Sequence, residues 1–317
     1  MDYGFGIPTR GPLANPEDIA AIAAAGERLG FAYASVNDHI VLPRAIASRY
    51  PYSETGAWPG GAAGDWLEPL GLLCFLAGVT RQVRLITSVL VLPYRAPLPQ
   101  AKLLTTIDVL SGGRLTIGCG VGWLREEFEA LEVGPFAERG RIADDYLAAF
   151  RELWTQEAPR FAGRHVRFSD IAFAPKPVQT PHPPLWIGGE SPAALARAAR
   201  LGDGWYPIGI NPQYPLDTAE RYAAAVADLR RRAEAAGRDP AALTLAYFAN
   251  WYGDPKLGRT DAGGRRAFTG APEEIAADIA RFREIGVRHL VLSFNRPTRD
   301  AVIDAMEAFM REVAARV

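Results

Sequence analysis

The stretch PPLWIGGESPAALARAARLGDGW, residues 183–205, shows the arrangement that decides the fold of this chain. A short apolar run, Leu185 to Ile187, stops at Gly188-Gly189, and Ser191-Pro192 then opens an alanine-rich helical pattern. A serine before a proline is typical of a helix start, because the hydroxyl accepts from an early amide and proline tolerates the first helical position. The stretch therefore predicts a strand, a glycine turn and a helix N-terminus, which together can offer backbone amides to an anion.

Strand-like and helix-like segments alternate in this way along the whole chain. Apolar runs predict strands at 3–8, 33–36, 84–92, 115–118, 185–187, 205–208, 243–251 and 289–294. Helical spacing predicts helices at 16–29, 66–79, 97–110, 137–155, 192–201, 216–236, from 272 onward, and 298–315. Eight units of roughly 40 residues suit a (β/α)8 barrel. We therefore predict an α/β fold, a single TIM-barrel domain over residues 1–317 with insertions after strands 2, 4 and 7. A doubly wound sheet is the alternative, because alternation alone does not separate the two.

The composition excludes several classes of protein. With 317 residues, 49% of them hydrophobic, the chain can bury a full core. A net charge of −1 offers no basic surface for nucleic acid or anionic lipid. Two cysteines, Cys74 and Cys119, fit a reducing compartment, and the N-terminus does not resemble a signal peptide. The longest apolar runs are too short to span a bilayer, so we expect a soluble cytoplasmic protein.

The predicted strand ends argue against several barrel chemistries. Ligand groups of such barrels come from the carboxyl ends of the strands. The lysines Lys102, Lys176 and Lys256 all fall in helices or loops, so no Schiff-base lysine is expected. His39 is the one histidine predicted at a strand end, so no metal site is expected. The glycine run 118–122 lacks the dinucleotide-binding spacing. A site rich in glycine and aromatic residues would instead let a bound cofactor supply the reactivity.

The whole chain resembles the luciferase-like monooxygenase family, a set of flavin- and deazaflavin-dependent (β/α)8 enzymes. The order and combination of the matching motifs carry the resemblance. They are VNDHIVLP at 36–43, ITSVLVLPYRAPLPQAK at 86–102, LSGGRLTIGCGVGW at 110–123, EFEAL at 127–131, and WIGGESPAAL followed by GDGW within 186–205.

The resemblance places the cofactor phosphate at the stretch quoted first. In that family the glycine-rich turn after the fifth strand and the helix behind it hold the phosphate of the flavin side chain. Here those residues are Gly188, Gly189, Glu190 and Ser191. The alternative is a tight strand-to-helix turn with no ligand.

Two further pairs are implied to face the cofactor ring. The family carries a non-proline cis peptide after the third strand, which here is Ser88–Val89; an ordinary buried strand is the alternative. In deazaflavin-using relatives the pair that matches Asp38-His39 lies beside the reactive ring carbon, which assigns Asp38 to cofactor binding and both residues to catalysis. A histidine suits proton exchange near neutral pH. The alternative is a structural histidine hydrogen-bonded by Asp38.

The glycine run after the fourth strand is implied to pass under the ring and its side chain, at Gly120 and Gly122. Val121 stands where the luciferase-type pattern has a phosphate-binding arginine, and Trp123 where deazaflavin sugar-phosphate dehydrogenases have a glutamate. Both departures argue against those particular reactions. Aromatic residues that could line a hydrophobic substrate pocket are Trp58, Trp66 and Tyr94.

These features predict a flavin-type oxidoreductase. Coenzyme F420 is preferred, from the Asp38-His39 pair, the TSVLVLP motif and the missing arginine; FMN is the alternative. F420 would support hydride transfer to or from a small organic substrate, whereas FMN would support monooxygenation with O2 through a flavin hydroperoxide.

Two other classes stay open: a non-catalytic flavin-binding barrel, and a cofactor-free lyase or hydrolase, for which no convincing acid–base pair is found. Expected partners are a flavin or F420 reductase as supplier and a second copy of the chain in a homodimer.

Overall fold

The computed structural model describes residues 1–60 and 65–317, and within them eight parallel strands close into a barrel. The barrel strands are β1 Asp2–Gly6, β2 Tyr33–Val36, β3 Arg84–Thr87, β5 Leu115–Gly120, β8 Leu185–Ile187, β9 Gly204–Trp205, β10 Thr244–Ala249 and β11 Val287–Leu292. Each strand pairs with the next one along the chain, and β11 pairs with β1. The predicted (β/α)8 barrel is therefore confirmed, because a doubly wound sheet would stay open.

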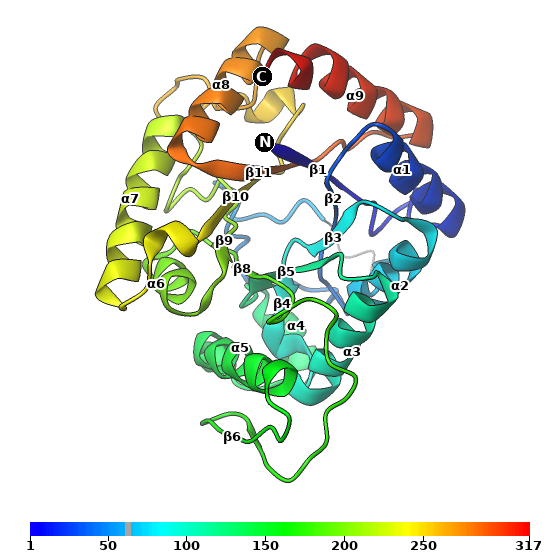
Figure 1. The fold of residues 1–317 in the computed structure, drawn as a ribbon. Coiled ribbons are helices and arrows are strands. Elements are labelled where there is room, and N and C mark those ends of the chain that lie inside the picture. The colour runs from blue at the N-terminus through cyan, green and yellow to red at the C-terminus, as the bar shows by residue number, and fades with distance from the viewer. Residues whose placement is uncertain (61–64) are drawn as a thin grey trace.

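Helices surround the ring of strands (Figure 1). They are α1 Pro16–Arg28, α2 Pro69–Val79, α3 Pro97–Leu110, α4 Arg125–Ala130, α5 Arg139–Thr155, α6 Pro192–Leu201, α7 Ala219–Ala235, α8 Pro272–Ile285 and α9 Arg299–Glu312. Each helix buries an apolar side against the barrel; α6, for example, buries Leu195, Ala198 and Ala199. Inside the ring, a second cluster of Tyr33, Ile86, Trp186, Tyr206, Ala246, Phe248 and Val291 fills the barrel. The barrel is thus a packed core rather than a channel.

Local sequence signals explain most helix starts. Proline occupies the first position of α1, α2, α3, α6 and α8, and Asn15, Ser191 and Thr298 cap α1, α6 and α9 with their side chains. The helix predicted from Trp66 begins three residues later, at Pro69. Glu68 is extended because a residue before proline is disfavoured in the α region, and its carboxylate instead accepts from Gly71 N.

The strand predicted over 84–92 is divided in two. β3 ends at Thr87, a cis Ser88–Val89 peptide follows, and a short β4, Leu90–Val91, then pairs with β5. A 3-10 turn at Leu92–Tyr94 leads into α3. The last strand also begins earlier than predicted, since β11 starts at Val287 and places His289 inside the strand.

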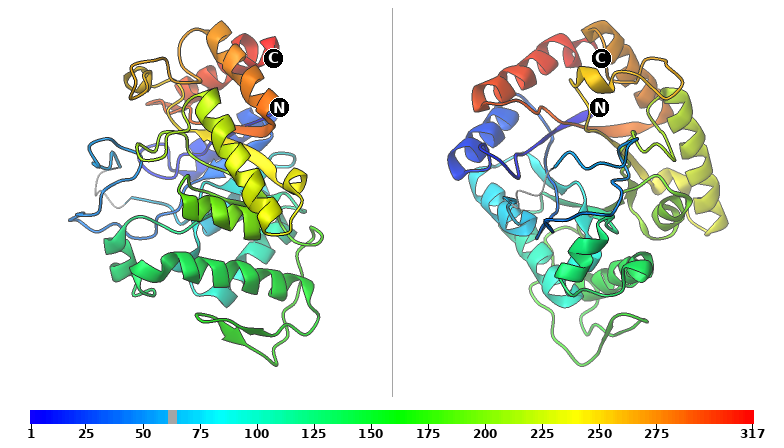
Figure 2. Two further views of the ribbon diagram at one scale, coloured as in Figure 1. Left: turned by 90° about the vertical axis from the view of Figure 1, so that its left-hand side faces the viewer. Right: turned by 180° about the vertical axis from the view of Figure 1, so that it is seen from behind.

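The three predicted insertions are present. They follow β2 (described at 37–60 and 65–68), β5 (121–184) and β10 (250–271); the second contains α4, α5 and a hairpin of β6 Phe161–Ala162 and β7 Arg167–Phe168. In the right-hand view of Figure 2, the loop after β2 crosses the carboxyl end of the ring of strands. In the stretches 1–60 and 65–317, no helix has both the length and the apolar character to cross a membrane.

Candidate functional site

The sequence-predicted site residues gather at the carboxyl ends of four neighbouring strands. Asp38 and His39 follow β2, Ser88 and Val89 follow β3, Gly120 and Gly122 lie at the end of β5, and Gly188, Gly189, Glu190 and Ser191 follow β8. Because β2, β3, β5 and β8 are consecutive in the ring, the four groups share one side of the barrel mouth.

His39 forms a buried pair with Glu127, from α4. The His39 Nδ1 and Glu127 Oε2 atoms are 2.7 Å apart, and Glu127 is fully buried. The same carboxylate accepts from the backbone N–H groups of Ile40 and Val41, at 2.7 and 3.2 Å, and from the Tyr94 hydroxyl at 2.9 Å. An acceptor-only carboxylate at Nδ1 holds the Nδ1–H tautomer, so Nε2 is the ring nitrogen left to exchange a proton.

Asp38 binds Arg95 rather than His39. Its two carboxylate oxygens each receive a guanidinium N–H at 2.9 Å, and Oδ2 also accepts from Val91 N at 2.8 Å. Burial raises the pKa of Asp38, and the charge of Arg95 opposes that shift. Asp38 is therefore not the hydrogen-bond partner of His39 that the alternative of a structural histidine expected: Asp38 fixes the β3–α3 connection, and Glu127 holds the histidine.

Aromatic rings surround His39. Trp58 and Trp66 lie 5.1 and 4.8 Å from its imidazole, between ring centroids, and Trp123 lies 6.5 Å away. Tyr50 packs on Trp123 at 5.1 Å. Trp58 and Trp66 thus lie beside His39, whereas Tyr94 is buried, with its hydroxyl on Glu127; a role of the three in substrate binding stays a prediction. The cluster gives this part of the mouth an apolar, planar lining.

The side chain of Val89 occupies space that is free because Gly120 and Gly188 have no side chains. It is only partly buried, above the cluster inside the barrel. A Cβ on Gly120 would clash with Val89 Cγ2, and one on Gly188 would lie 2.9 Å from Val89 Cγ1. The peptide before it is cis, as the resemblance implies, and Ser88 Oγ lies 2.8 Å from the Tyr206 hydroxyl. Both glycines are thus needed for the position that Val89 occupies.

The N-terminus of α6 presents unused amides beside Val89. Gly188 N donates to Cys119 O, and Ala194 N donates to the Ser191 hydroxyl. Among the hydrogen bonds of the described residues, none uses the amides of Gly189, Ser191 or Ala193. Gly189 has a φ of +97°, a conformation that favours glycine. Free amides at a helix start fit a phosphate group.

The side chain of Glu190 is buried beside these amides. It accepts from Ile208 N at 2.7 Å and from the Asn211 amide at 3.2 Å, and it is hydrogen-bonded to Tyr52, from the insertion after β2. Burial raises the pKa of this carboxyl to about 7, although the hydrogen bonds act in the opposite direction. Its side chain thus joins the α6 turn to the end of β9 and to the loop that crosses the mouth.

Two arginines without carboxylate partners among the described residues flank Phe136, near Gly122. The guanidinium carbons of Arg125 and Arg139 lie 4.6 and 4.0 Å from the centre of the Phe136 ring, and Arg139 Nε donates to Gly122 O at 3.1 Å. Burial, and then the charges of Arg125 and Arg197, lower the pKa of Arg139. Cations held together in this way favour an anion at the end of β5.

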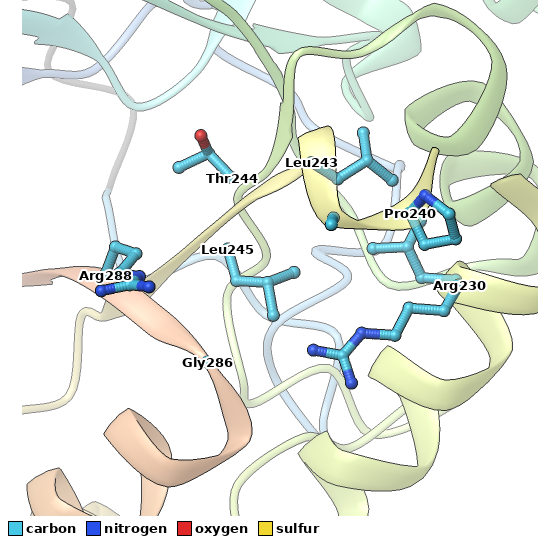
Figure 3. A pocket seen from close by; sticks show the side chains of 9 residues that line it. Arg230, Pro240, Leu243, Thr244, Leu245, Gly286 and Arg288 are labelled. Atoms are coloured by element: carbon cyan, nitrogen blue, oxygen red, sulfur yellow. The ribbon is translucent and has the colours of Figure 1, made fainter. Parts of the chain in front are cut away.

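A separate cleft of about 310 Å³ lies at the opposite, amino end of the barrel (Figure 3). It is lined at the start of β10 by Leu243 and Leu245, just before β11 by Gly286, and by Arg230 and Arg288. None of the residues predicted from the sequence lines it. The predicted site is therefore confined to the carboxyl end.

Three residues of the mouth were missed by sequence reasoning: Glu127, Arg95 and Arg139. Glu127 and Arg95 lie inside motifs that carried the family resemblance, but nothing in their local pattern showed their partners. Glu127 is 88 residues from His39, and Arg95 is 57 residues from Asp38. A glutamate on the apolar side of a short helix was the available signal for Glu127.

The family model described as luciferase-like monooxygenase matches residues 1–256 of this chain. An FMNH2-dependent dimethylsulfone monooxygenase of Pseudomonas putida is 32% identical over 191 residues, which are 59% of this chain and half of that enzyme's length. An uncharacterised protein of Mycobacterium bovis is 30% identical over 320 residues, covering 100% of this chain and 99% of that protein.

Solved structures agree with the fold. The monooxygenase RslO1 from Streptomyces bottropensis is 25% identical, with a TM-score of 0.73 and 99% coverage of both chains. An F420-dependent secondary alcohol dehydrogenase, in complex with an F420–acetone adduct, is 17% identical, with a TM-score of 0.75, and covers 100% of this chain and 99% of that one. The second likeness concerns the fold alone.

Proposed function

Because this chain belongs to the luciferase-like monooxygenase family, we propose that it is an F420-dependent oxidoreductase that transfers hydride to or from a small organic substrate. The observation that carries the proposal is the pairing of His39 Nδ1 with the buried Glu127 carboxylate at 2.7 Å, beside the free amides of α6. One feature handles a proton and the other suits a phosphate, and the two lie in the same barrel mouth.

The described residues fit a flavin-type cofactor. The amides of Gly189, Ser191 and Ala193 would bind its phosphate, and Arg139 offers a cation nearby, although Val121 replaces the arginine of the luciferase-type pattern. The surface made by Val89, Gly120 and Gly188 would support the ring, with Gly122 beneath the side chain. Bound F420 supplies hydride transfer, and bound FMN would supply oxygen insertion.

In this proposal His39 donates or accepts the proton that accompanies hydride transfer. Nδ1–H donates to Glu127, which fixes the ring and stabilises the imidazolium whenever Nε2 holds a proton. Asp38 positions this loop through Arg95 and Val91. Trp58, Trp66 and Trp123 exclude water and bind the substrate, so a flat and largely apolar substrate is favoured.

FMN is the second candidate cofactor, because a specific observation favours it. The 32% identical relative is named as FMNH2-dependent, and the 25% identical structure is a monooxygenase. With FMN the reaction would be monooxygenation, and a flavin reductase would supply the reduced cofactor; with F420 an F420 reductase would do so.

A cofactor titration tests the proposal. The purified protein, mixed with F420 or FMN in oxidised and reduced forms, should bind at least one with a shift in the absorbance spectrum. Failure of both to bind would overturn the proposal, and binding of FMN alone would select the second candidate. His39→Ala should then keep the affinity within about twofold while turnover falls by roughly 10²–10⁴. His165→Ala, outside the mouth, serves as the control.

We also propose that the protein forms a homodimer. Exposed apolar side chains gather on α2 and α3: Val79, Leu103, Val109 and Leu110. Such side chains on neighbouring helices favour contact with another chain. Light scattering after gel filtration would show about twice the mass of the 34.4 kDa chain if the proposal is right, and the monomer mass would contradict it.

A further inference from the structure

We propose that binding of the phosphorylated cofactor tail at the N-terminus of α6 makes Glu190 take up a proton, so that cofactor affinity depends on pH around neutrality. The inference rests on the proposed function for the location of the phosphate. It adds a coupling between two neighbouring anions: the ligand phosphate and the Glu190 carboxylate.

The geometry places both anions on the same turn. The amides that suit the phosphate belong to Gly189, Ser191 and Ala193, and Glu190 lies among them. A glutamate side chain holds its carboxyl group within about 5 Å of its own backbone, so a phosphate on these amides lies within roughly 8 Å of it. Glu190 is 5% exposed, and water therefore screens little of the repulsion.

The groups around Glu190 are neutral hydrogen-bond donors, including its own backbone N–H, and burial outweighs their effect on its pKa. Ile208 N and the Asn211 amide are neutral donors, and Tyr52 from the insertion is a neutral hydroxyl. Tyr50 from the same insertion and Tyr247 from β10 also lie within the field of Glu190, and both are neutral phenols at pH 7. The charge of Arg10 lowers the pKa of Tyr50, and no cation hydrogen-bonds the Glu190 carboxyl among the described residues. The negative charge of a bound phosphate therefore shifts the protonation equilibrium of Glu190 toward the neutral carboxylic acid.

The network around the carboxyl can accept the added proton. The protonated carboxyl still offers a carbonyl oxygen to Ile208 N, and its hydroxyl can donate to the Tyr52 oxygen, since a tyrosine hydroxyl both donates and accepts. Protonation thus reverses one hydrogen bond without breaking the link between the turn and the insertion. The hydrogen bonds around Glu190 would therefore stay intact on ligand binding, whether its carboxyl is protonated or not.

Calorimetric titration with F420 provides the test. Its phosphodiester does not titrate near neutrality, whereas the FMN monoester does, with a second pKa of about 6. At pH 7.5, titrations in two buffers of different ionisation enthalpy should show uptake of a fraction of a proton per site. The Kd should rise roughly tenfold between pH 6 and pH 9. Glu190→Gln should bind F420 with a Kd that is nearly constant over that range, while Glu157→Gln, an exposed control, should behave like the unaltered protein.

The outcomes separate the two proposals. If F420 and FMN both fail to bind, the proposed function is wrong. If F420 binds but the heat is the same in both buffers and the Kd is constant with pH, the proposed function stands and the coupling to Glu190 is overturned. If the pH dependence persists in Glu190→Gln, another group takes up the proton and the assignment to Glu190 is wrong. Should this variant fail to fold, Tyr52→Phe takes its place: it removes a hydrogen bond that lowers the pKa of Glu190, so the rise in Kd should move to higher pH, and a rise at the unaltered pH would overturn the assignment.

Discussion

Two glutamates are buried in the barrel mouth, and their surroundings differ. Glu127 receives four hydrogen-bond partners: His39, Tyr94 and two successive backbone amides. Glu190 is held by neutral groups, and burial raises its pKa to about 7. Both carboxylates thus have several donors, and they differ in what they hold: Glu127 fixes the His39 imidazole and the loop after β2, whereas Glu190 is held only by neutral groups and burial outweighs their effect on its pKa.

The largest effect is expected from removing the Glu127 carboxylate. Glu127→Ala should lower the free energy of unfolding by about 3–5 kcal/mol, because it leaves the buried His39 and Tyr94 side chains, and the part-buried amides of Ile40 and Val41, without their acceptor. Urea unfolding measures the change. Glu126→Ala is the matched control, since that carboxylate binds two amides at the surface, and it should cost about 1 kcal/mol. Equal losses in the two variants would contradict this role of Glu127.

The second prediction concerns the packing of Val89 against Gly120 and Gly188. Gly120→Ala should cost about 3 kcal/mol by overpacking, because Val89 cannot move away from the new methyl group without meeting Gly188. Cofactor binding should weaken as well. Gly78→Ala, in α2 with nothing within 4 Å of the added carbon, should be neutral or stabilising. Thermal unfolding of both variants shows whether space at Val89 is the reason.

Glu190 should make stability depend on pH in the direction opposite to a paired carboxylate. Its pKa is about 7 in the folded protein against an ordinary value of 4.5, so the folded state binds more protons between these values and gains stability as the pH falls. Glu190→Gln should therefore be more stable than the unaltered protein by about 3 kcal/mol at pH 8. The difference should vanish near pH 4.5; a difference that is constant with pH would contradict this assignment.

The smallest effect concerns Arg139. Arg139→Gln should weaken F420 binding about fivefold, or about 1 kcal/mol, and reduce its salt dependence, if the proposed site is right, since the cation beside Gly122 is lost. Fluorescence titration at low and high salt measures both quantities. Arg164→Gln, on an exposed arginine paired with Glu138, is the control. If Arg139→Gln bound F420 with unchanged affinity, Arg139 would not be part of the cofactor site.

The sequence was sufficient for the barrel because each strand–helix unit has local signals. Proline and serine mark the start of α6, and apolar runs mark the strands. It was also sufficient to place Asp38, His39, Val89 and Glu190 at one end, since parallel strands point their carboxyl ends the same way. Their roles stay predictions.

The partners of these residues could not be predicted, because they depend on how distant segments meet. Asp38 pairs with Arg95, and His39 pairs with Glu127 on a short helix that the sequence pattern did not reveal. The break between β3 and β4 was likewise hidden, since the residues from Ile86 to Leu92 form one continuous apolar run apart from Thr87 and Ser88. Tertiary contacts rather than local propensity decide such features.

A crystal structure of the protein with F420 or FMN tests the central claim most directly. We expect the phosphate within hydrogen-bonding distance of the amides of Gly189, Ser191 and Ala193, and the ring against Val89 with its reactive side toward His39. A phosphate bound elsewhere on the barrel, or a ring out of reach of His39, would contradict the account.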